Sequence, residues 1–303
     1  MAQSQREPDP VLLTGASGYV GSDLLGELLR RGRRVRALAR RPEPGRFPAA
    51  VDVRQGDAVA GTGLPQALDG CRTAYYLIHS MGRGSGPAEA FAQRDREAAV
   101  NFGEAARDAG VERVIYLGGL GAAGDDTSDH LRSRHEVAGL LRERVPELVY
   151  VRAAMIIGRG SASFEMLRYL TSRLPVMITP RWLDTRTQPV AVQDVVRALA
   201  DLAELERAPA EVQLGGAEVL TYREMITRTA AVLGRRRPLI VKVPVLTPRL
   251  SSYWVALVTP VDVGLVRPLI DGLKEEMVVD APPPRGVNDG PMGFDDAVRA
   301  ALA

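Results

Sequence analysis

A glycine-rich segment near the start of the chain has the residue types and spacing of a phosphate-binding loop. It reads Thr14-Gly15-Ala16-Ser17-Gly18-Tyr19-Val20-Gly21 and stands between a short apolar run and an amphipathic stretch. In such a loop the first glycine permits a tight turn, the second lets the backbone approach a pyrophosphate, and the third lets a helix pack against a strand. The helix N-terminus then offers free N–H groups to the phosphates. The loop predicts a dinucleotide site; the alternative is a structural turn that binds nothing.

The segment after the second apolar run bears on which dinucleotide is bound. It reads Val35-Arg36-Ala37-Leu38-Ala39-Arg40-Arg41-Pro42, with no acid before Glu43. NAD-binding domains usually present an acid there for the ribose 2′-hydroxyl, whereas an arginine can grip a 2′-phosphate with paired hydrogen bonds. We expect Arg40 or Arg41 to make this contact and the cofactor to be NADP(H). The alternative is that both are surface charges in an arginine-rich protein.

Three polar side chains are candidates for chemistry beyond the loop. His130 and Arg134 stand four residues apart, so they share one face of a predicted helix. Histidine titrates near neutrality and could act as a general acid, while arginine could bind ribose hydroxyls but cannot relay a proton. His79 follows another apolar run and is a second candidate acid. Each histidine also has a structural alternative, His130 as a solvated residue at a helix start and His79 as a backbone anchor.

The elements that must position these residues alternate between strands and helices up to residue 152. The predicted strands are 11–14, 35–38, 51–53, 74–78, 114–117 and 148–151, and the predicted helices are about 20–29, 88–109 and 130–144. This alternation predicts an α/β fold with a doubly wound parallel sheet of Rossmann type. We expect residues 1–152, joined by parts of 187–215, to form the cofactor domain. Residues 153–303 would form a smaller substrate lobe beside the carboxyl edge of the sheet.

The second half of the sequence is less regular. Helices are predicted at 164–170 and 193–205 and a strand at 212–214, and Thr221 with Glu224 has the form of a capping box. The glycine- and serine-containing loop at 158–163 should border the substrate cleft. Residues 246–273 include Tyr253 and Trp254 with few charges, which fits either the core of the small lobe or an apolar cleft wall.

The glycine loop resembles that of the extended and atypical short-chain dehydrogenases/reductases, especially the NmrA-like NAD(P)H-binding group. The similarity continues through Gly56-Asp57, Tyr75 to Met81, Ala109 to Leu117 and Val151 to Ala154. The resemblance implies that Asp57 contacts adenine and that residues 77–79 line the adenosine and ribose. The cofactor contacts that it implies outside the loop are Asp57, Ala58, Leu77, Ile78, His79, Gly118, Gly119, Arg134, Ala153 and Met155.

The catalytic residues usual in that family are missing. Such reductases carry a serine after the fifth strand and a Tyr-x-x-x-Lys pair in the next helix. Here the corresponding positions are Gly118-Gly119, His130 and Arg134, and no lysine precedes Lys242. We therefore expect either a reductase of an apolar carbonyl, enone or quinone-like compound with a different proton donor, or a non-catalytic NADP(H)-holding redox sensor or assembly subunit.

Composition excludes several other classes. The 303 residues carry a net charge of +2, and the 39 basic residues, only two of them lysines, are interspersed with acids, which argues against a nucleic-acid footprint. Cys71 is the single cysteine, so we expect no disulfide and no metal site. The polar N-terminus lacks a signal-peptide core, and no apolar run reaches the roughly 18 residues of a span. We expect a cytoplasmic protein without a transmembrane segment and leave its oligomeric state open.

Overall fold

The computed structural model describes residues 9–79, 88–121, 128–174, 176–179, 181–242 and 275–303. Seven parallel strands form the central sheet, in the order β11-β6-β5-β4-β1-β2-β3. These strands are β1 (Val11–Thr14), β2 (Val35–Ala39), β3 (Asp52–Gln55), β4 (Thr73–Tyr76), β5 (Arg113–Gly119), β6 (Glu147–Ala153) and β11 (Glu211–Leu214). The predicted Rossmann-type α/β fold is confirmed.

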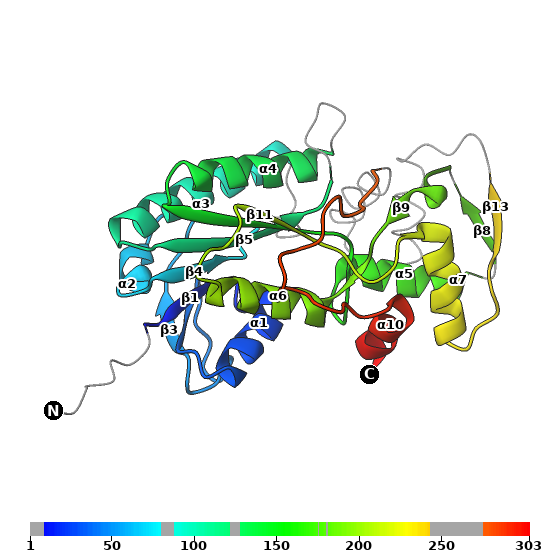
Figure 1. Cartoon of the computed structure of the whole chain (residues 1–303), viewed down its shortest axis with the longest axis horizontal. Helices are drawn as coiled ribbons and strands as arrows, with labels where there is room; N and C mark the ends of the chain where they lie inside the picture. The colour runs from blue at the N-terminus through cyan, green and yellow to red at the C-terminus, as the bar shows by residue number, and fades with distance from the viewer. Residues whose placement is uncertain (1–8, 80–87, 122–127, 175, 180, 243–274) are drawn as a thin grey trace.

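Helices cover both faces of this sheet (Figure 1). One layer holds α1 (Tyr19–Arg30) and α6 (Val192–Glu204), and the other holds α2 (Leu64–Leu68), α3 (Ala88–Asp108) and α4 (Asp129–Arg142). Side chains alternate between the two cores along each strand, so that Leu13 packs with α1 and α6 while Leu12 packs with the opposite layer. Burial on both faces explains why β1, β4, β5 and β6 read as nearly continuous apolar runs in the sequence, whereas the edge strand β3 is largely exposed and polar.

The smaller lobe forms around three further helices. They are α5 (Ala162–Arg173), α7 (Tyr222–Val232) and α10 (Phe294–Leu302), whose apolar faces share one core. The predicted capping box at Thr221 is present, since its hydroxyl accepts from the Glu224 N–H and the Glu224 carboxylate accepts from the Thr221 N–H. Short pairings complete the lobe: β7 (Ile156–Ile157) with β10 (Val190–Ala191), β9 (Arg186–Thr187) with β12 (Leu220–Thr221), and β8 (Val176–Thr179) with β13 (Leu239–Lys242).

The chain passes more than once between the sheet and the lobe. After α5 it returns to the sheet as α6 and β11, and after α7 it comes back once more through residues 275–293 to end at α10 (Figure 1). Residues 246–273, including Tyr253 and Trp254, lie outside the described residues. No helix in the described part combines the length and apolarity needed to cross a membrane.

Candidate functional site

The candidate site lies at the carboxyl edge of the sheet, where four neighbouring strands end together. Thr14 ties two of these ends to each other. Its fully buried hydroxyl donates to the Tyr75 carbonyl at 2.9 Å and accepts from the Leu77 N–H at 3.1 Å. Because these bonds fix the chain just before Gly15 against the chain just after β4, the glycine loop and Leu77 form one rigid rim.

The geometry of the loop explains two of its glycines. Gly15 has φ +70°, and a Cβ there would lie 2.7 Å from the Leu77 carbonyl oxygen. A Cβ on Gly21 would overlap the Gly15 carbonyl oxygen, so helix α1 packs directly on the loop. Gly18 is the N-cap of α1 and has no side-chain cap, and its N–H is held by the Gly15 carbonyl at 2.8 Å. The first turn of α1 is thus left without a side chain over its N–H groups.

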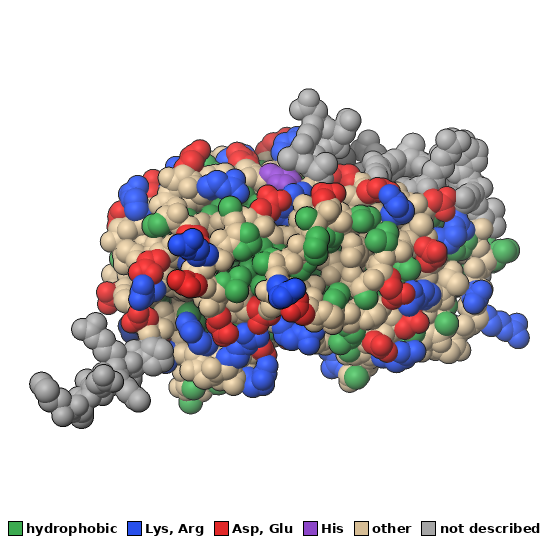
Figure 2. Space-filling model, in the orientation of Figure 1, with side chains coloured by type: hydrophobic (Ala, Val, Ile, Leu, Met, Phe, Trp, Pro, Cys, Tyr) green, Lys and Arg blue, Asp and Glu red, His purple; other side chains and the backbone are tan. Residues whose placement is uncertain are grey.

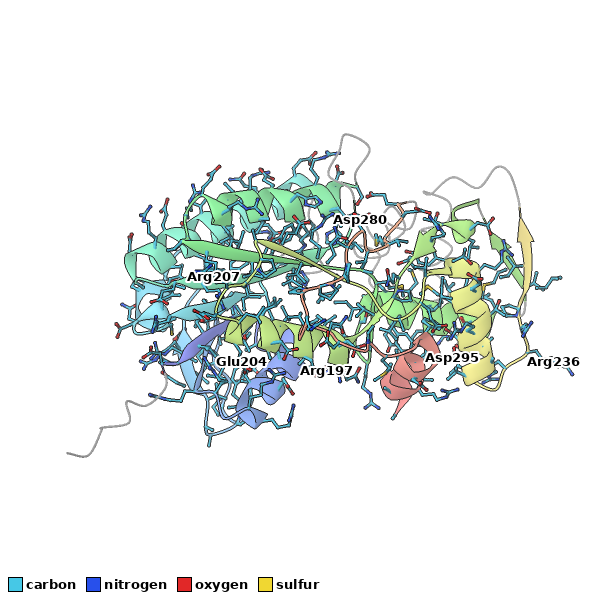
Figure 3. The ribbon with its side chains drawn as sticks, in the orientation of Figure 1. Arg197, Glu204, Arg207, Arg236, Asp280 and Asp295 are labelled. Atoms are coloured by element: carbon cyan, nitrogen blue, oxygen red, sulfur yellow. The ribbon has the colours of Figure 1, made fainter. Side chains whose placement is uncertain are left out.

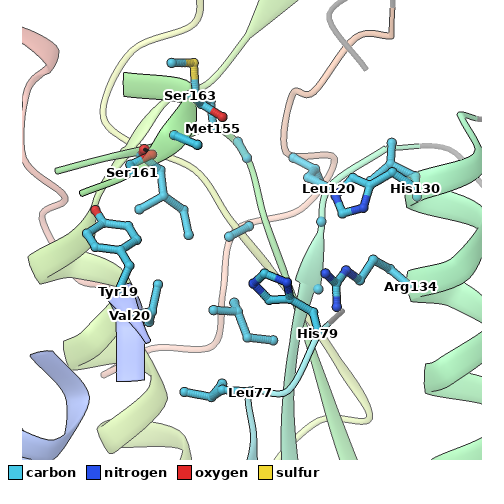
Figure 4. Close-up of a pocket in the computed structure, with 18 of the residues that line it drawn as sticks. Tyr19, Val20, Leu77, His79, Leu120, His130, Arg134, Met155, Ser161 and Ser163 are labelled. Carbon is cyan, nitrogen blue, oxygen red and sulfur yellow. Dashed lines mark hydrogen bonds between the residues drawn. The ribbon is translucent and has the colours of Figure 1, made fainter. Parts of the chain in front are cut away.

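A pocket of about 310 Å³ opens above this rim (Figure 4). The glycine loop and Tyr19 form one side, and α4 forms the opposite side with His130 and Arg134. The predicted cofactor residues that line it are Gly15, Gly18, Tyr19, Val20, Gly21, Leu77, His79, Gly118, Gly119, Arg134, Ala153 and Met155. The glycine pair that ends β5 is constrained as well, because a Cβ on Gly118 would lie 2.6 Å from the Tyr150 ring.

Arg134 is a buried cation whose side chain faces this pocket. Its side chain points toward His79 from the opposite wall (Figure 4), and no carboxylate within the described residues forms an ion pair with it. Burial alone would lower the pKa of Arg134, but the neighbouring Tyr116 and Asp95 raise it, so the guanidinium stays charged. The site therefore holds a fixed positive charge.

His130 lies on the same wall, one turn before Arg134. Burial and the positive charge of Arg134 lower the pKa of His130 to about 3. The ring is therefore neutral near pH 7 and does not carry the proton that a charged general acid would donate. The expectation that His130 supplies this proton stays a prediction, and the protonation state of the free protein argues against it.

Six predicted cofactor residues lie outside the pocket: Ser17, Arg40, Arg41, Asp57, Ala58 and Ile78. Arg40 and Arg41 are exposed just after β2. The carboxylate of Asp57 accepts from the Val59 N–H at 2.9 Å, which shapes the turn after β3. Arg40 and Arg41 follow β2, and Asp57 and Ala58 follow β3, at one end of the sheet. Ser17 follows β1 and Ile78 follows β4, nearer the pocket.

Sequence reasoning missed several residues that the fold brings to the site. Arg46 reaches the glycine loop, where its guanidinium donates to the Ser17 carbonyl at 3.3 Å. Met277 and Tyr222 reach the pocket from distant parts of the chain. Tyr19 was expected to contact the cofactor. Its hydroxyl is buried and has no hydrogen-bond partner among the described residues, and the sequence does not indicate this. The sequence signal that could have indicated Arg46 is that it is one of three arginines in the connection after β2.

No group of three or more potential metal ligands gathers within the described residues. The groups that line the pocket include backbone N–H groups, one guanidinium, two imidazole rings, the hydroxyls of Ser161 and Ser163, and aliphatic side chains. Apolar side chains dominate the wall beyond the glycine loop, among them Leu117, Leu120, Leu131, Met155 and Ile156.

Comparison with known proteins adds three findings. Residues 15–155 match the protein family described as NAD(P)H-binding. A ceramide reductase from Caulobacter vibrioides is 31% identical over 245 residues, covering 77% of this chain and 73% of that protein. A 3 beta-hydroxysteroid dehydrogenase/Delta 5-->4-isomerase from Mycobacterium tuberculosis is 35% identical over 132 residues, which is 38% of this chain and 35% of that protein.

The solved structures include a nucleoside-diphosphate-sugar epimerase from Staphylococcus aureus. It superimposes with a TM-score of 0.75 at 18% identity, covering 96% of this chain and 99% of the epimerase. At this identity the likeness concerns the fold alone.

Proposed function

From the premise that the chain belongs to the atypical short-chain dehydrogenase/reductase family of NAD(P)H-binding proteins, we propose that it is an NADPH-dependent reductase of an apolar carbonyl compound. The observation that carries this proposal is a single pocket that joins the glycine loop, a buried guanidinium and an aliphatic wall. The three parts correspond to the three tasks of such an enzyme: holding the cofactor, stabilising charge and accepting the substrate.

The glycine loop fits the diphosphate of a dinucleotide. The uncapped N-terminus of α1 presents N–H groups, and the absence of a side chain at Gly18 lets a phosphate approach them. Leu77 and the pair Gly118–Gly119 form a floor without bulky groups, along which the rest of the cofactor would lie. When bound, the nicotinamide supplies a hydride.

Support for NADP(H) over NAD(H) comes from three arginines. Arg40 and Arg41 stand where an NAD-binding domain would present an acid, and Arg46 contacts the glycine loop from the same connection. A 2′-phosphate between these guanidinium groups would receive charge-assisted hydrogen bonds.

The wall of the pocket supports an apolar substrate. Its lining beyond the loop is mainly aliphatic, and Arg134 is the one charged side chain that faces it among the described residues. Two relatives that are named for acting on a ceramide and on a steroid, both largely apolar molecules, agree with this assignment. A nucleotide-sugar would need more polar partners than this wall provides.

Arg134 would make the main contribution of the protein to catalysis. A fixed guanidinium beside the carbonyl oxygen of the substrate would stabilise the negative charge that develops on this oxygen during reduction. Neutral His130 would donate an N–H hydrogen bond from the same wall. The proton that completes the alcohol would then come from water or from His79 at the exposed rim.

The direct test uses NADPH carrying deuterium at C4 and a panel of carbonyl compounds: a long-chain aliphatic ketone, a ketosteroid, a quinone and a nucleotide-sugar. We expect deuterium on the carbonyl carbon of an apolar alcohol product, detected by mass spectrometry. Tight NADPH binding with no consumption by any compound would favour the second candidate, a cofactor-holding sensor or assembly subunit, which the absence of the usual tyrosine and lysine also favours.

A further inference from the structure

The end of the smaller lobe that lies away from the sheet presents arginines and aliphatic side chains together. There β13 and β8 run parallel, with Leu239 opposite Val176, and these two side chains are 63% and 48% exposed. The connection between α7 and β13 carries Arg235, Arg236 and Arg237, all exposed. Figure 3 shows Arg236 projecting from this end into solvent, beyond every helix of the lobe.

The charge at this end is not balanced locally. Between Glu224 and Asp262 the sequence contains no acidic residue but six basic ones. Of these, Arg228 is neutralised within the lobe by Glu218 and Asp295, at 2.5 and 2.8 Å. The side chains of Arg235, Arg236 and Arg237 form no ion pair or hydrogen bond with any residue that the structure describes.

Many arginines elsewhere on the surface are matched by acids. Examples are the pairs of Arg72 with Glu112 and of Arg186 with Glu276, and Figure 2 shows basic and acidic side chains interspersed over the face in view. Arg40 and Arg41 after β2 also lack an acidic partner among the described residues. The cluster of Arg235, Arg236 and Arg237 differs in lying beside Val176 and Leu239, two of the three exposed large hydrophobic side chains of the described residues.

We propose that this surface, formed by Val176, Arg235, Arg236, Arg237 and Leu239 and called the arginine tip below, docks on a lipid bilayer that contains anionic lipids. The guanidinium groups would pair with phosphate and carboxylate headgroups, while Leu239 and Val176 would enter the interface between headgroups and acyl chains. Arginine suits this position because its aliphatic stem can lie along apolar surface while its charged end stays at headgroup level.

A bilayer explains the composition of the arginine tip better than a nucleic acid does. The arginines alone would suit a phosphate backbone, but such a backbone offers no apolar environment for Leu239 and Val176. A bilayer interface accepts both kinds of side chain at once. The proposal does not depend on the reaction, although a protein that reduces an apolar compound would gain access to a substrate dissolved in the membrane.

The test is sedimentation of the full-length protein with vesicles of phosphatidylcholine alone and of phosphatidylcholine with phosphatidylglycerol. We expect binding only to the anionic vesicles, weakening as salt is raised. Each arginine near an anionic surface contributes about a factor of five, so the combined variant R235Q/R236Q/R237Q should bind roughly 100-fold more weakly. The variant V176T/L239T keeps the charge and the strand preference, and should lose the part of the binding that survives high salt.

The matched control is R142Q/R207Q/R285Q, which removes three exposed arginines elsewhere and changes the net charge equally. It should bind vesicles like the native protein, and thermal melting should show that all variants are folded. Equal losses in both arginine triples would overturn the proposal, since net charge alone would then explain binding. Binding to a labelled oligonucleotide but not to anionic vesicles would also overturn it. So would a dimer that V176T/L239T dissociates while vesicle binding stays unchanged.

Discussion

At the scale of single residues, the preference between NADPH and NADH should depend on the three arginines after β2. We expect native NADPH binding to exceed NADH binding by a factor of about 10 to 150, the effect of one charge-assisted hydrogen bond. Replacing the contacting residue among Arg40, Arg41 and Arg46 with alanine should remove most of this preference while barely changing NADH affinity. Calorimetric titration of both cofactors measures the ratio.

The control for this series is Arg142→Ala, an exposed arginine at the end of α4. Its variant should keep the native ratio. Equal affinities for the two cofactors in the native protein would refute the assignment of NADP(H), and an unchanged ratio in all three alanine variants would place the selectivity elsewhere.

His130 gives a second prediction at the residue scale, because its pKa in the folded protein lies far below its usual value of 6.5. The unfolded chain takes up a proton on this ring as pH falls below about 6.5, whereas the folded chain does so only near pH 3, so acid favours unfolding. The free energy of unfolding should fall by about 1.6 kcal/mol between pH 6.5 and 5 from this group. Urea titrations at both pH values measure the loss.

His130→Gln removes the titrating group and should be less sensitive to pH by that amount. The comparison is needed because the pKa of His135 is lowered too, and it contributes a loss in the same direction. Identical pH dependence in the variant and the native protein would show that the ring is solvated in the folded state. A solvated His130 ring could be protonated near neutral pH and would again be a candidate general acid.

The sequence indicated those residues whose role follows from local spacing. The three glycines of the loop and the position of Arg134 four residues after His130 belong to this group, because turn and helix geometry fix them. The ionisation of His130 depends on burial and on where the Arg134 side chain points, which a single helix does not determine. Arg46 was missed because its approach to Ser17 depends on the path of an irregular connection.

At the scale of elements, the glycine loop and α1 form one unit. Substitutions at different glycines of this unit should have different effects, on cofactor binding in one case and on stability in another. Gly18→Val should abolish binding of either cofactor, because its side chain would occupy the phosphate position. Gly18 has extended backbone angles that valine adopts, and a Cβ there would lie 3.1 Å from the Gly15 carbonyl oxygen, which a shift of a few tenths of an ångström relieves, so the protein should stay folded. Gly21→Ala should destabilise the fold itself, since the new Cβ would overlap the Gly15 carbonyl oxygen. Thermal melting and cofactor titration together separate the two effects.

Gly26→Ala in the same helix provides the control. A Cβ at Gly26 meets no atom within 4 Å, so this variant should bind cofactor normally and gain about 0.5–1 kcal/mol from helix propensity. Retained binding in a folded Gly18→Val protein would mean that the loop is only a turn.

The long elements were predictable and the short ones were not. Strands such as β1 and β5 are buried on both faces, so their apolar runs stand out, and the helices show a clear apolar face. Strand β4 ends at Tyr76 and not at residue 78, because Leu77 leaves the ladder to bond the Thr14 hydroxyl. The two-residue strands of the smaller lobe have no periodicity long enough to detect, since tertiary contacts alone create them.

At the scale of the whole molecule, the last 29 residues connect the sheet to the smaller lobe. Met277 exchanges backbone hydrogen bonds with Arg186 and Gln188, and the buried Asp194 of α6 accepts from the Met292 N–H at 2.8 Å. Helix α10 then fills the core of the lobe with Phe294, whose N–H donates to Glu218 at 2.9 Å. Because of these contacts, and because the chain passes between the two parts repeatedly, we propose that the sheet and the smaller lobe unfold together.

Phe294→Ala tests this coupling. The side chain is 2% exposed, so its loss should cost about 3–5 kcal/mol of unfolding free energy. Both tryptophans, Trp182 and Trp254, belong to the second half of the sequence, so their fluorescence reports on that half, while loss of NADPH binding reports on the glycine loop. If the molecule unfolds as one unit, the two signals should move together to the same lower urea midpoint.

Val219→Ala is the control, at a side chain that is 43% exposed. It should change the free energy of unfolding reported by either signal by no more than about 0.5 kcal/mol. A variant that loses its fluorescence transition at low urea yet still binds NADPH would show instead that the lobe unfolds by itself, because the sheet and its glycine loop would then be stable without α10.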